Sequence, residues 1–207
     1  MGKLLTINNK LVKLSNSFLI PYATPSPPPP FNTVTIGNQV WAATNLAIDD
    51  GDSGIIRIDS VQYYTYYNEL VDIGPQYYYT LGAAERIANT IQGWHVPTEA
   101  EWNTLLTYAG ASVSQSVAVS ALGTRDMWTN KATANTLGFG ALPAGLVRNA
   151  VSVDYQGYYA MFKVGDSAFK YCILASAPGY GETAAVINGG TTDSEYYSVR
   201  LIKDSQV

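Results

Sequence analysis

The stretch Gly93–Gly110, GWHVPTEAEWNTLLTYAG, constrains the fold more than any other part of the chain. Thr98 and Glu101 have the T-x-x-E spacing of a capping box, in which the threonine hydroxyl and the glutamate carboxylate each accept a hydrogen bond from the other's backbone amide. Pro97 cannot extend a helix backwards, so the helix is expected to begin directly after Thr98. We expect it to end before Gly110, where a residue free to adopt positive φ is favoured.

Apolar residues in this stretch recur with the period of a helix. Trp102, Leu105, Leu106 and Ala109 stand at i, i+3, i+4 and i+7, which predicts one buried helix face. Trp94 adds a second large aromatic side chain on the other side of the turn. Aromatic residues at helical spacing usually pack in a core, so we expect this stretch to be structural and not catalytic.

The composition excludes several classes of function. The chain has 207 residues, a formal net charge of −4 and a pI near 4.9, and it contains no basic block, so we expect no nucleic-acid partner. No apolar run approaches the roughly eighteen residues of a membrane-spanning helix, so we expect no membrane insertion. A single cysteine, Cys172, allows neither an internal disulfide nor a site of several thiolates, and we expect it to be buried as a small apolar residue.

A proline-rich stretch divides the chain. Residues 1–22 alternate weakly between apolar and polar types, which predicts two short strands, Leu4–Ile7 and Leu11–Leu14, or an extended anchoring arm. Polar residues interrupt each apolar run there, so we expect no signal peptide. Residues 23–31, ATPSPPPPF, favour polyproline II and form a semi-rigid linker. We therefore expect the main domain to cover residues 32–207.

The main domain is predicted to be α+β. Gly37-Asn38 is a two-residue turn typical of a hairpin, here between Thr33–Ile36 and Gln39–Trp41. A first helix is predicted over Leu81–Ile91, followed by the capped helix, and a strand-rich half then favours an antiparallel sheet over βαβ winding. Further elements are expected as a short helical turn at Ser116–Leu122 and as strands at Val61–Tyr67, Tyr158–Val164, Tyr171–Ala175, Ala184–Ile187 and Tyr197–Ile202.

The order of several motifs resembles a known family. The blocks V-T-I-G-N-Q-V-W, Y-Y-T-L-G-A-A, G-W-H-V-P-T-E-A-E-W-N-T-L, G-F-G-A-L-P-A-G and S-V-R-L-I-K-D, over residues 34–204, resemble the Fibrobacter succinogenes major paralogous domain. The resemblance implies a C-type-lectin-like fold, with two helices on a twisted antiparallel sheet and the termini close together. It also implies a relation in outline to formylglycine-generating enzymes and to the variable proteins of diversity-generating retroelements, and most members are exported bacterial proteins.

The chain departs from the active relatives of that fold. Formylglycine-generating enzymes use active-site cysteines, which a lone Cys172 does not match. Calcium-dependent lectins carry an E-P-N or Q-P-D tripeptide and a W-N-D block, which the sequence lacks. The loop Asp49–Gly54, DDGDSG, has neither the ligand spacing nor the closing glutamate of a calcium loop, so we expect a solvated turn. We expect no metal and no cofactor.

The sequence offers no catalytic constellation. His95 is the only histidine, and nothing in the sequence places a nucleophile or an orienting carboxylate near it. Glu101 is already assigned to the helix cap. We therefore expect His95 to be a hydrogen-bonded structural residue and the protein not to be an enzyme.

Tyrosines are concentrated in the C-terminal half, interleaved with polar residues. A tyrosine combines a rigid apolar ring with a polar tip and suits a recognition surface, although alternate tyrosines can also simply tile a sheet. Both interpretations stay open. The candidate ligand-binding residues are Tyr155, Tyr158, Tyr159, Tyr180, Glu182 and Tyr196.

These observations favour a non-enzymatic structural and recognition protein. We expect a component of a bacteriophage virion surface, such as a decoration, fibre or receptor-binding head, that assembles as a homotrimer. Residues 1–31 would bind other virion subunits, and the C-terminal half would bind a host-surface glycan or protein. The alternatives are an exported bacterial adhesin or glycan-binding module at the cell surface or secreted, an enzyme of the formylglycine-generating type, and a retroelement-diversified binding protein.

Overall fold

The chain divides into two compact units, residues 1–30 and residues 31–207. A computed structural model describes residues 4–7, 10–15, 18–21, 28–64, 68–125, 127–129, 133–177, 181–189 and 194–205. The N-terminal unit contains an antiparallel sheet in the order β1 (Leu4–Ile7), β2 (Lys10–Ser15) and β3 (Phe18–Pro21). The sequence predicted two strands in this unit and did not predict the third. β3 ends in Pro21 and lies at the edge of the sheet, the position where proline is tolerated in a strand.

The larger unit, which we call the head, begins one residue earlier than predicted. Phe31 was assigned to the linker, but its ring contacts Trp94 edge-on at 4.9 Å between centroids. The unit boundary therefore falls between Pro30 and Phe31. Residues 23–27 of the predicted linker lie outside the described residues.

The capped helix forms as predicted. Helix α2 (Glu99–Tyr108) begins after Thr98, and both hydrogen bonds of the capping box with Glu101 are present. Trp102, Leu105, Leu106 and Ala109 are all buried. Beyond the helix, Gly110 has a φ of 96°, as expected for the residue that ends it.

The other two helices differ in length from the sequence prediction. Helix α1 (Leu81–Ala88) begins after Thr80, whose hydroxyl accepts from the amide of Ala83, and it ends three residues before the predicted Ile91. Asn89 and Thr90, both weak helix formers, follow its last turn. Helix α3 (Gln115–Leu122) is an eight-residue helix where only a short helical turn was expected.

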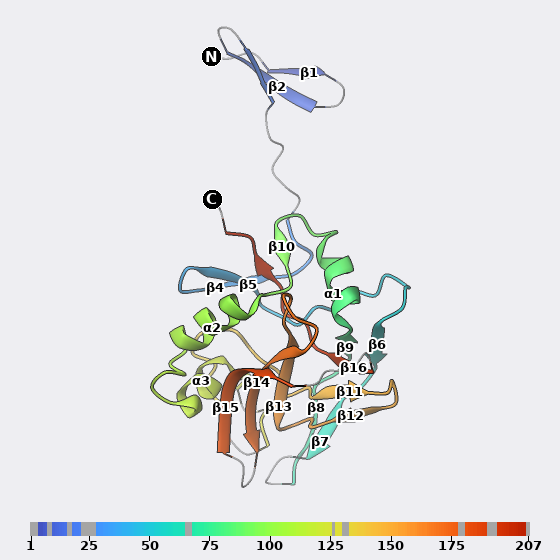
Figure 1. Ribbon diagram of the computed structural model, residues 1–207, viewed down its shortest axis with the longest axis vertical. Helices are drawn as coiled ribbons and strands as arrows, with labels where there is room; N and C mark the ends of the chain where they lie inside the picture. The colour runs from blue at the N-terminus through green and yellow to red at the C-terminus, as the bar shows by residue number, and fades with distance from the viewer. Residues whose placement is uncertain are drawn as a thin grey trace. The chain divides into compact units, whose positions relative to one another are not determined.

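The strands of the head form antiparallel sheets (Figure 1). A four-stranded sheet has the order β10 (Trp94–His95), β17 (Ile202–Lys203), β5 (Gln39–Ala42) and β4 (Thr33–Ile36). A five-stranded sheet has the order β12 (Ser152–Asp154), β11 (Leu146–Arg148), β16 (Glu195–Tyr197), β9 (Gln76–Tyr79) and β6 (Ile55–Ile58). The remaining sheets are the meander β13 (Tyr159–Lys163), β14 (Lys170–Ala177) and β15 (Gly181–Asn188), and the hairpin β7 (Gln62–Tyr64) and β8 (Leu70–Asp72).

The C-terminal segment contains the largest departure from the sequence prediction. Tyr197–Ile202 was expected to be one strand, but its ends belong to β16 and β17, which lie in different sheets. β17 pairs with β5, next to the first strand of the head. Of the predicted strand Val61–Tyr67, only Gln62–Tyr64 forms β7, and residues 65–67 lie outside the described residues.

Two helices and the meander enclose the main core. Helices α2 and α3 cover one face of the meander, where Trp102 stacks on Phe162 at 5.3 Å between centroids and lies 4.9 Å from Trp41. Cys172 is fully buried in this core, as predicted. The head is thus a mixed α/β unit with mostly antiparallel sheets and, among its described residues, three helices.

Arg200 occupies the gap between β16 and β17. Its side chain is buried, and its Nη atoms donate to the carbonyl oxygens of Ala42, Phe139 and Gly140 at 3.1, 2.6 and 3.2 Å. Nε and Nη2 also donate to the Asn45 side-chain oxygen. Burial lowers the pKa of the guanidinium. These bonds tie the C-terminal segment to two distant parts of the chain and explain why the chain leaves the sheet here.

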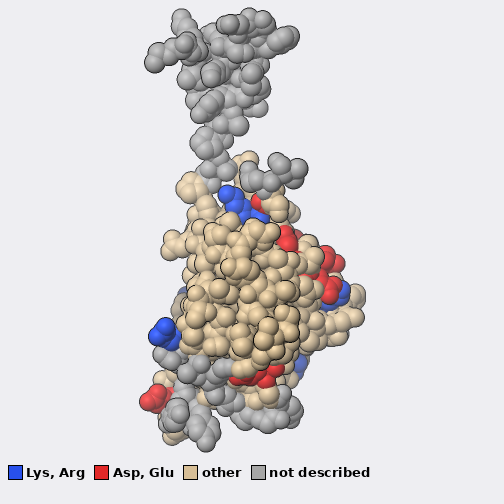
Figure 2. Space-filling view, turned by 90° about the vertical axis from the view of Figure 1, so that its left-hand side faces the viewer, with Lys and Arg blue, Asp and Glu red and all other residues tan. Residues whose placement is uncertain are grey.

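One side of the head has little charge. The sequence contains no Lys, Arg, Asp or Glu between Glu101 and Arg125, the segment that forms most of α2 and all of α3. Figure 2 shows a broad area on this side without charged side chains. In the part of the chain that the structure describes, no helix is long and apolar enough to cross a membrane.

Candidate functional site

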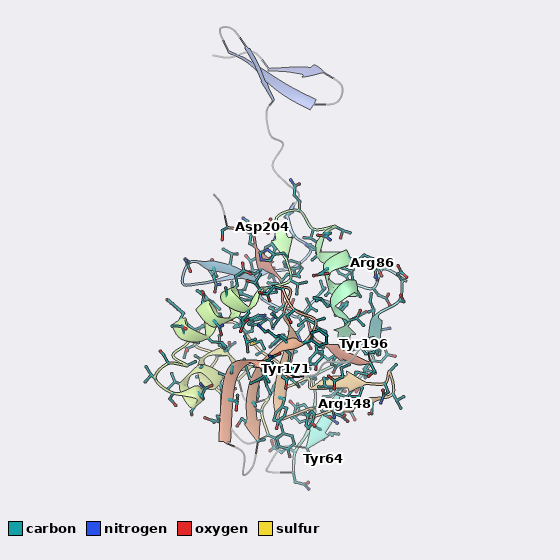
Figure 3. All side chains as sticks on the ribbon, viewed as in Figure 1. Tyr64, Arg86, Arg148, Tyr171, Tyr196 and Asp204 are labelled. Carbon is teal, nitrogen blue, oxygen red and sulfur yellow. The ribbon has the colours of Figure 1, made fainter. Side chains whose placement is uncertain are left out.

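Four tyrosines gather on the face of the meander that α2 and α3 leave uncovered. We call Tyr155, Tyr159, Tyr171 and Tyr197 the tyrosine cluster. Tyr155 stacks on Tyr159 at 4.9 Å between centroids with a 20° angle between the rings, and Tyr171 stacks on Tyr197 at 5.4 Å and 22°. The rings rest on an apolar base of Leu146, Met161, Ile173, Ala175 and Ile187. Figure 3 shows Tyr171 in the middle of the head, with Tyr64 and Asp204 at opposite ends.

Tyr155 is held in an unusual backbone conformation. Its φ is 64°, in the left-handed region that bulky residues rarely adopt, and 42% of its surface is exposed. Its carbonyl accepts from the amides of Tyr158 and Tyr159 at 3.2 and 3.0 Å, which closes a tight turn. Such a conformation costs on the order of 1–3 kcal/mol and persists where surrounding contacts impose it. An exposed aromatic ring in a strained turn is typical of a surface that makes contacts.

Charged groups connect the two stacks. Arg148 Nε donates to Glu195 at 3.0 Å, and its guanidinium carbon lies 5.3 Å from the centroid of the Tyr155 ring. Glu195 also accepts from the Tyr197 hydroxyl at 2.7 Å. Burial, followed by the neighbouring Glu195 carboxylate, raises the pKa of Tyr197, so this phenol stays protonated. The cluster therefore combines aromatic faces with both signs of charge.

A buried lysine supports the cluster from the side. Lys163, at the end of β13, is only 3% exposed, and its Nζ lies 4.3 Å from the centroid of the Tyr197 ring. An ammonium over an aromatic face is favourable, and more so when it is removed from water. This contact fixes the orientation of the Tyr171–Tyr197 stack.

The structure brings together only part of the candidate set. Tyr155 and Tyr159 belong to the cluster. Tyr158 is half-buried, and its carbonyl accepts from the Ser176 amide. Ser176 pairs with Glu182 on β15. The candidates Tyr158 and Glu182 therefore both lie at the end of the meander. Tyr196 lies on the opposite face of β16 from Tyr197 and packs with Tyr78 and Val147. Tyr180 lies outside the described residues.

Sequence reasoning missed Tyr171, Arg148 and Lys163. Tyr171 had a usable signal, because alternate residues of a strand point to opposite faces and its neighbour Cys172 was expected to be buried. Arg148 and Lys163 had no such signal. Their roles depend on contacts with β16, which is far away in the sequence, because Arg148 bonds to Glu195 and Lys163 lies against the Tyr197 ring.

His95 is hydrogen-bonded as expected, but its partners are carboxylates that the sequence did not place there. Nδ1 lies 2.7 Å from Asp204, and Nε2 lies 2.9 Å from Glu101 Oε2. The hydrogen bond to Glu101, and then that to Asp204, raises the pKa of His95. Burial opposes ionisation of Glu101, but the bonds from His95 and Thr98 outweigh it and lower its pKa. Carboxylates at both ring nitrogens favour the imidazolium form, and the ring joins α2 to the C-terminal segment.

The loop Asp49–Gly54 is occupied by an internal ion pair. Arg86 donates from Nε and Nη2 to the two carboxylate oxygens of Asp50 at 2.7 and 3.0 Å, and these bonds lower the pKa of Asp50 to about 2. Within the described ranges, no three His, Cys, Asp or Glu side chains are grouped as metal ligands.

The comparisons with known proteins return one match. The family model of the Fibrobacter succinogenes major domain matches residues 34–203, from β4 to the end of β17. No curated protein and no solved structure matches the chain. The match includes the capping box of α2, the strained turn at Tyr155 and the buried Arg200. Because it covers more than half of the sequence, the chain belongs to the Fibrobacter succinogenes major domain family.

Proposed function

We propose that this protein is a non-enzymatic recognition protein, in which the N-terminal unit attaches the head to a larger assembly and the tyrosine cluster contacts a ligand. The observation that carries the proposal is the cluster itself. It presents the Tyr155–Tyr159 stack, with Tyr155 exposed in a strained turn, beside the Arg148–Glu195 pair, whereas the ring of Tyr197 is buried. Tyrosine and arginine are the residue types most enriched in binding hot spots.

We further propose that the head has a C-type-lectin-like fold. Two features support this assignment. Helices and antiparallel sheets are combined as that fold requires. The two ends of the head also lie close together, because Trp94 contacts Phe31 and pairs with Lys203.

The reactive residue types in the head support a role in binding. Cys172 is fully buried, and burial raises the pKa of its thiol, so it is neither accessible nor ionised. This disfavours thiol chemistry of the formylglycine-generating type. His95 already holds two carboxylates, which leaves it poorly suited to accept a proton from a substrate.

The assembly that we propose is a bacteriophage virion, with the protein as a homotrimer on its surface. The N-terminal unit spans only residues 1–30 and contains a small sheet, and units of this size usually need a partner to fold stably. A neighbouring subunit supplies such a partner. The ligand of the head is a host-surface glycan or protein.

Fractionation of the source culture tests the location. An antibody against the head is used to follow the protein through sedimented particles, cell envelope and soluble fractions. Co-sedimentation with particles is expected, and light scattering of the purified chain should give the mass of three copies. Deletion of residues 1–30 should leave a folded head that is absent from particles, and continued incorporation of the truncated protein contradicts the anchor role.

An exported bacterial surface adhesin is the second candidate. The same fractionation separates the two. Signal in the cell envelope or the medium, with none in particles, supports the adhesin. The tyrosine cluster would then bind its ligand from the cell surface.

A further inference from the structure

A groove runs beside helix α1 and borders the tyrosine cluster, since Lys163 and Glu195, which contact Tyr197, also line it. We call it the α1 groove. It encloses about 650 Å³ and is lined by the start of α1, the end of the loop Asp49–Gly54, the turn after β13, and Glu195 and Tyr196 of β16. This volume is within the range of small-molecule sites, roughly 300–1,000 Å³. Figure 3 labels two of its lining residues, Arg86 on α1 and Tyr196 on β16.

The walls of the groove are held in place by contacts inside the head. The Thr80 amide donates to Gly54 at 2.9 Å, and a Cβ at Gly54 would lie 2.6 Å from Thr80 Oγ1, so the loop and the helix start are in close contact. The bidentate bond of Arg86 to Asp50 fixes the loop to the next turn of α1. Because these walls are already fixed, binding of a ligand in the groove costs little conformational entropy of the protein.

Donors and acceptors are mixed along the groove. Gly82 is exposed and no described atom lies within 4 Å of the position of a Cβ there, and its amide belongs to the first turn of α1, which has no partner within the helix. Arg86, which is bonded to Asp50, and Lys163, which is buried against the Tyr197 ring, add cationic groups. Glu85 and Glu195 add carboxylates, of which Glu195 is bonded to Arg148. Hydroxyl groups are the chemistry that uses such a mixture fully, because each one both donates and accepts.

An aromatic ring stands at the edge of the groove. Phe169 lines it and is 63% exposed, although the side chain of a phenylalanine is normally buried. Its ring offers a flat apolar face to a ligand, and Tyr196, which packs with Tyr78 and Val147, also lines the groove. Flat apolar faces next to hydroxyl-binding groups match a pyranose ring, whose C–H bonds form an apolar face and whose hydroxyls surround it.

We propose that the α1 groove binds a neutral saccharide, with Phe169 against the C–H face of a pyranose ring and its hydroxyls on the mixed polar wall. The inference deepens the proposed recognition function by naming the ligand class of the head and a second surface next to the tyrosine cluster. Neutrality follows from the charges. Both signs line the groove, so a net charge on the ligand meets repulsion from one of them.

Titration of the labelled full chain, followed by amide NMR shifts, tests the proposal. The probes are methyl glycosides of glucose, galactose, mannose and N-acetylglucosamine, raised to about 20 mM because contacts of this size give roughly millimolar dissociation constants. At least one probe is expected to shift the amides of Gly82, Phe169 and Tyr196. Phe169→Ala is expected to weaken that probe by roughly tenfold. Tyr64→Ala is the matched control, since Tyr64 is 60% exposed but lies on β7, outside the groove.

The outcomes separate clearly. The proposal is overturned if no probe shifts these amides, if Phe169→Ala binds as tightly as the parent, or if Tyr64→Ala is the variant that loses binding. Tighter binding of glucuronate or glucosamine than of the neutral glycosides also overturns it, because the groove would then select a charge. Thermal denaturation establishes that Phe169→Ala and Tyr64→Ala both fold. Tyr196→Phe removes only a hydroxyl from the same groove, and we expect it to lower the affinity for the saccharide as well. The virion role is measured by sedimentation, so it stands or falls independently of these titrations.

Discussion

Replacing Arg200 with methionine is expected to cost more stability than any other single arginine replacement in the head. The side chain is 1% exposed and donates to three backbone carbonyls and to Asn45. Methionine fills much of the same volume but donates no hydrogen bond. The carbonyl oxygens of Ala42, Phe139 and Gly140 would then stay buried without these donors.

The magnitude follows from the number of acceptors left behind. A buried polar group without its partner costs about 1–3 kcal/mol, and the loss of one partner from a buried charged network costs about 3–5 kcal/mol. Part of this is offset, because the guanidinium itself no longer has to be kept out of water. We therefore expect a loss of about 3–5 kcal/mol, which for a unit of this size lowers the melting temperature by roughly 6–20 °C.

Chemical denaturation and calorimetry of the full chain measure this change, and Arg148→Met is the matched control. Arg148 also pairs with acidic groups, but 41% of its side chain is exposed, so its loss is expected to cost less than about 1 kcal/mol. The reasoning is refuted if Arg200→Met loses less than about 1 kcal/mol, or if the two variants lose the same amount.

Three further variants test other parts of the head. His95→Gln is expected to lower the free energy of unfolding by about 1 kcal/mol. The loss should be largest between pH 4.5 and pH 6.5, the ordinary pKa values of glutamate and histidine. Thr98→Ala removes one side of the capping box and should cost about 0.5–2 kcal/mol by thermal denaturation. Gly157→Ala, with φ at 84° and a Cβ placed 2.5 Å from Thr129 Oγ1, should cost more than Gly51→Ala, which has φ at 77° but open space around it.

The pH profile of His95→Gln has a defined sign. Folding raises the pKa of His95, so its contribution is complete below 6.5 and is lost as the pH rises through the folded value. Folding lowers the pKa of Glu101, so that contribution is complete above 4.5 and is lost as the pH falls through the folded value. A difference between variant and parent that does not shrink at alkaline pH contradicts the ion-pair assignment. Equal stability of Gly157→Ala and Gly51→Ala contradicts the close contact at Gly157.

The sequence was most informative where the determinants of structure are local. The capping box of Thr98 and Glu101 and the turn at Gly37-Asn38 each lie within a few residues, and both form as predicted. The predicted strands Tyr158–Val164, Tyr171–Ala175 and Ala184–Ile187 were also found, as β13, β14 and β15, because each pairs with a neighbour in the sequence. Strands such as β6 and β9 were missed, since their pairing joins Ile55–Ile58 to Gln76–Tyr79 and has no strong local pattern.

The candidate site was only partly predictable for the same reason. Tyrosine content indicated a recognition surface, but not which rings meet, because Tyr171 and Tyr197 come together only through tertiary packing. The C-terminal strand was predicted as continuous because the interruption depends on the acceptors of Arg200, which lie about 60 and 158 residues away in the sequence. The carboxylate of Asp204 is 109 residues from His95, so no spacing rule links them.

Trp94 lies beside both ends of the head, through the ring of Phe31 and through its pairing with Lys203. A domain whose two ends lie close together can be inserted into a surface loop of an unrelated protein without separating the two sides of that loop. Copies of such a domain can also be repeated along one polypeptide.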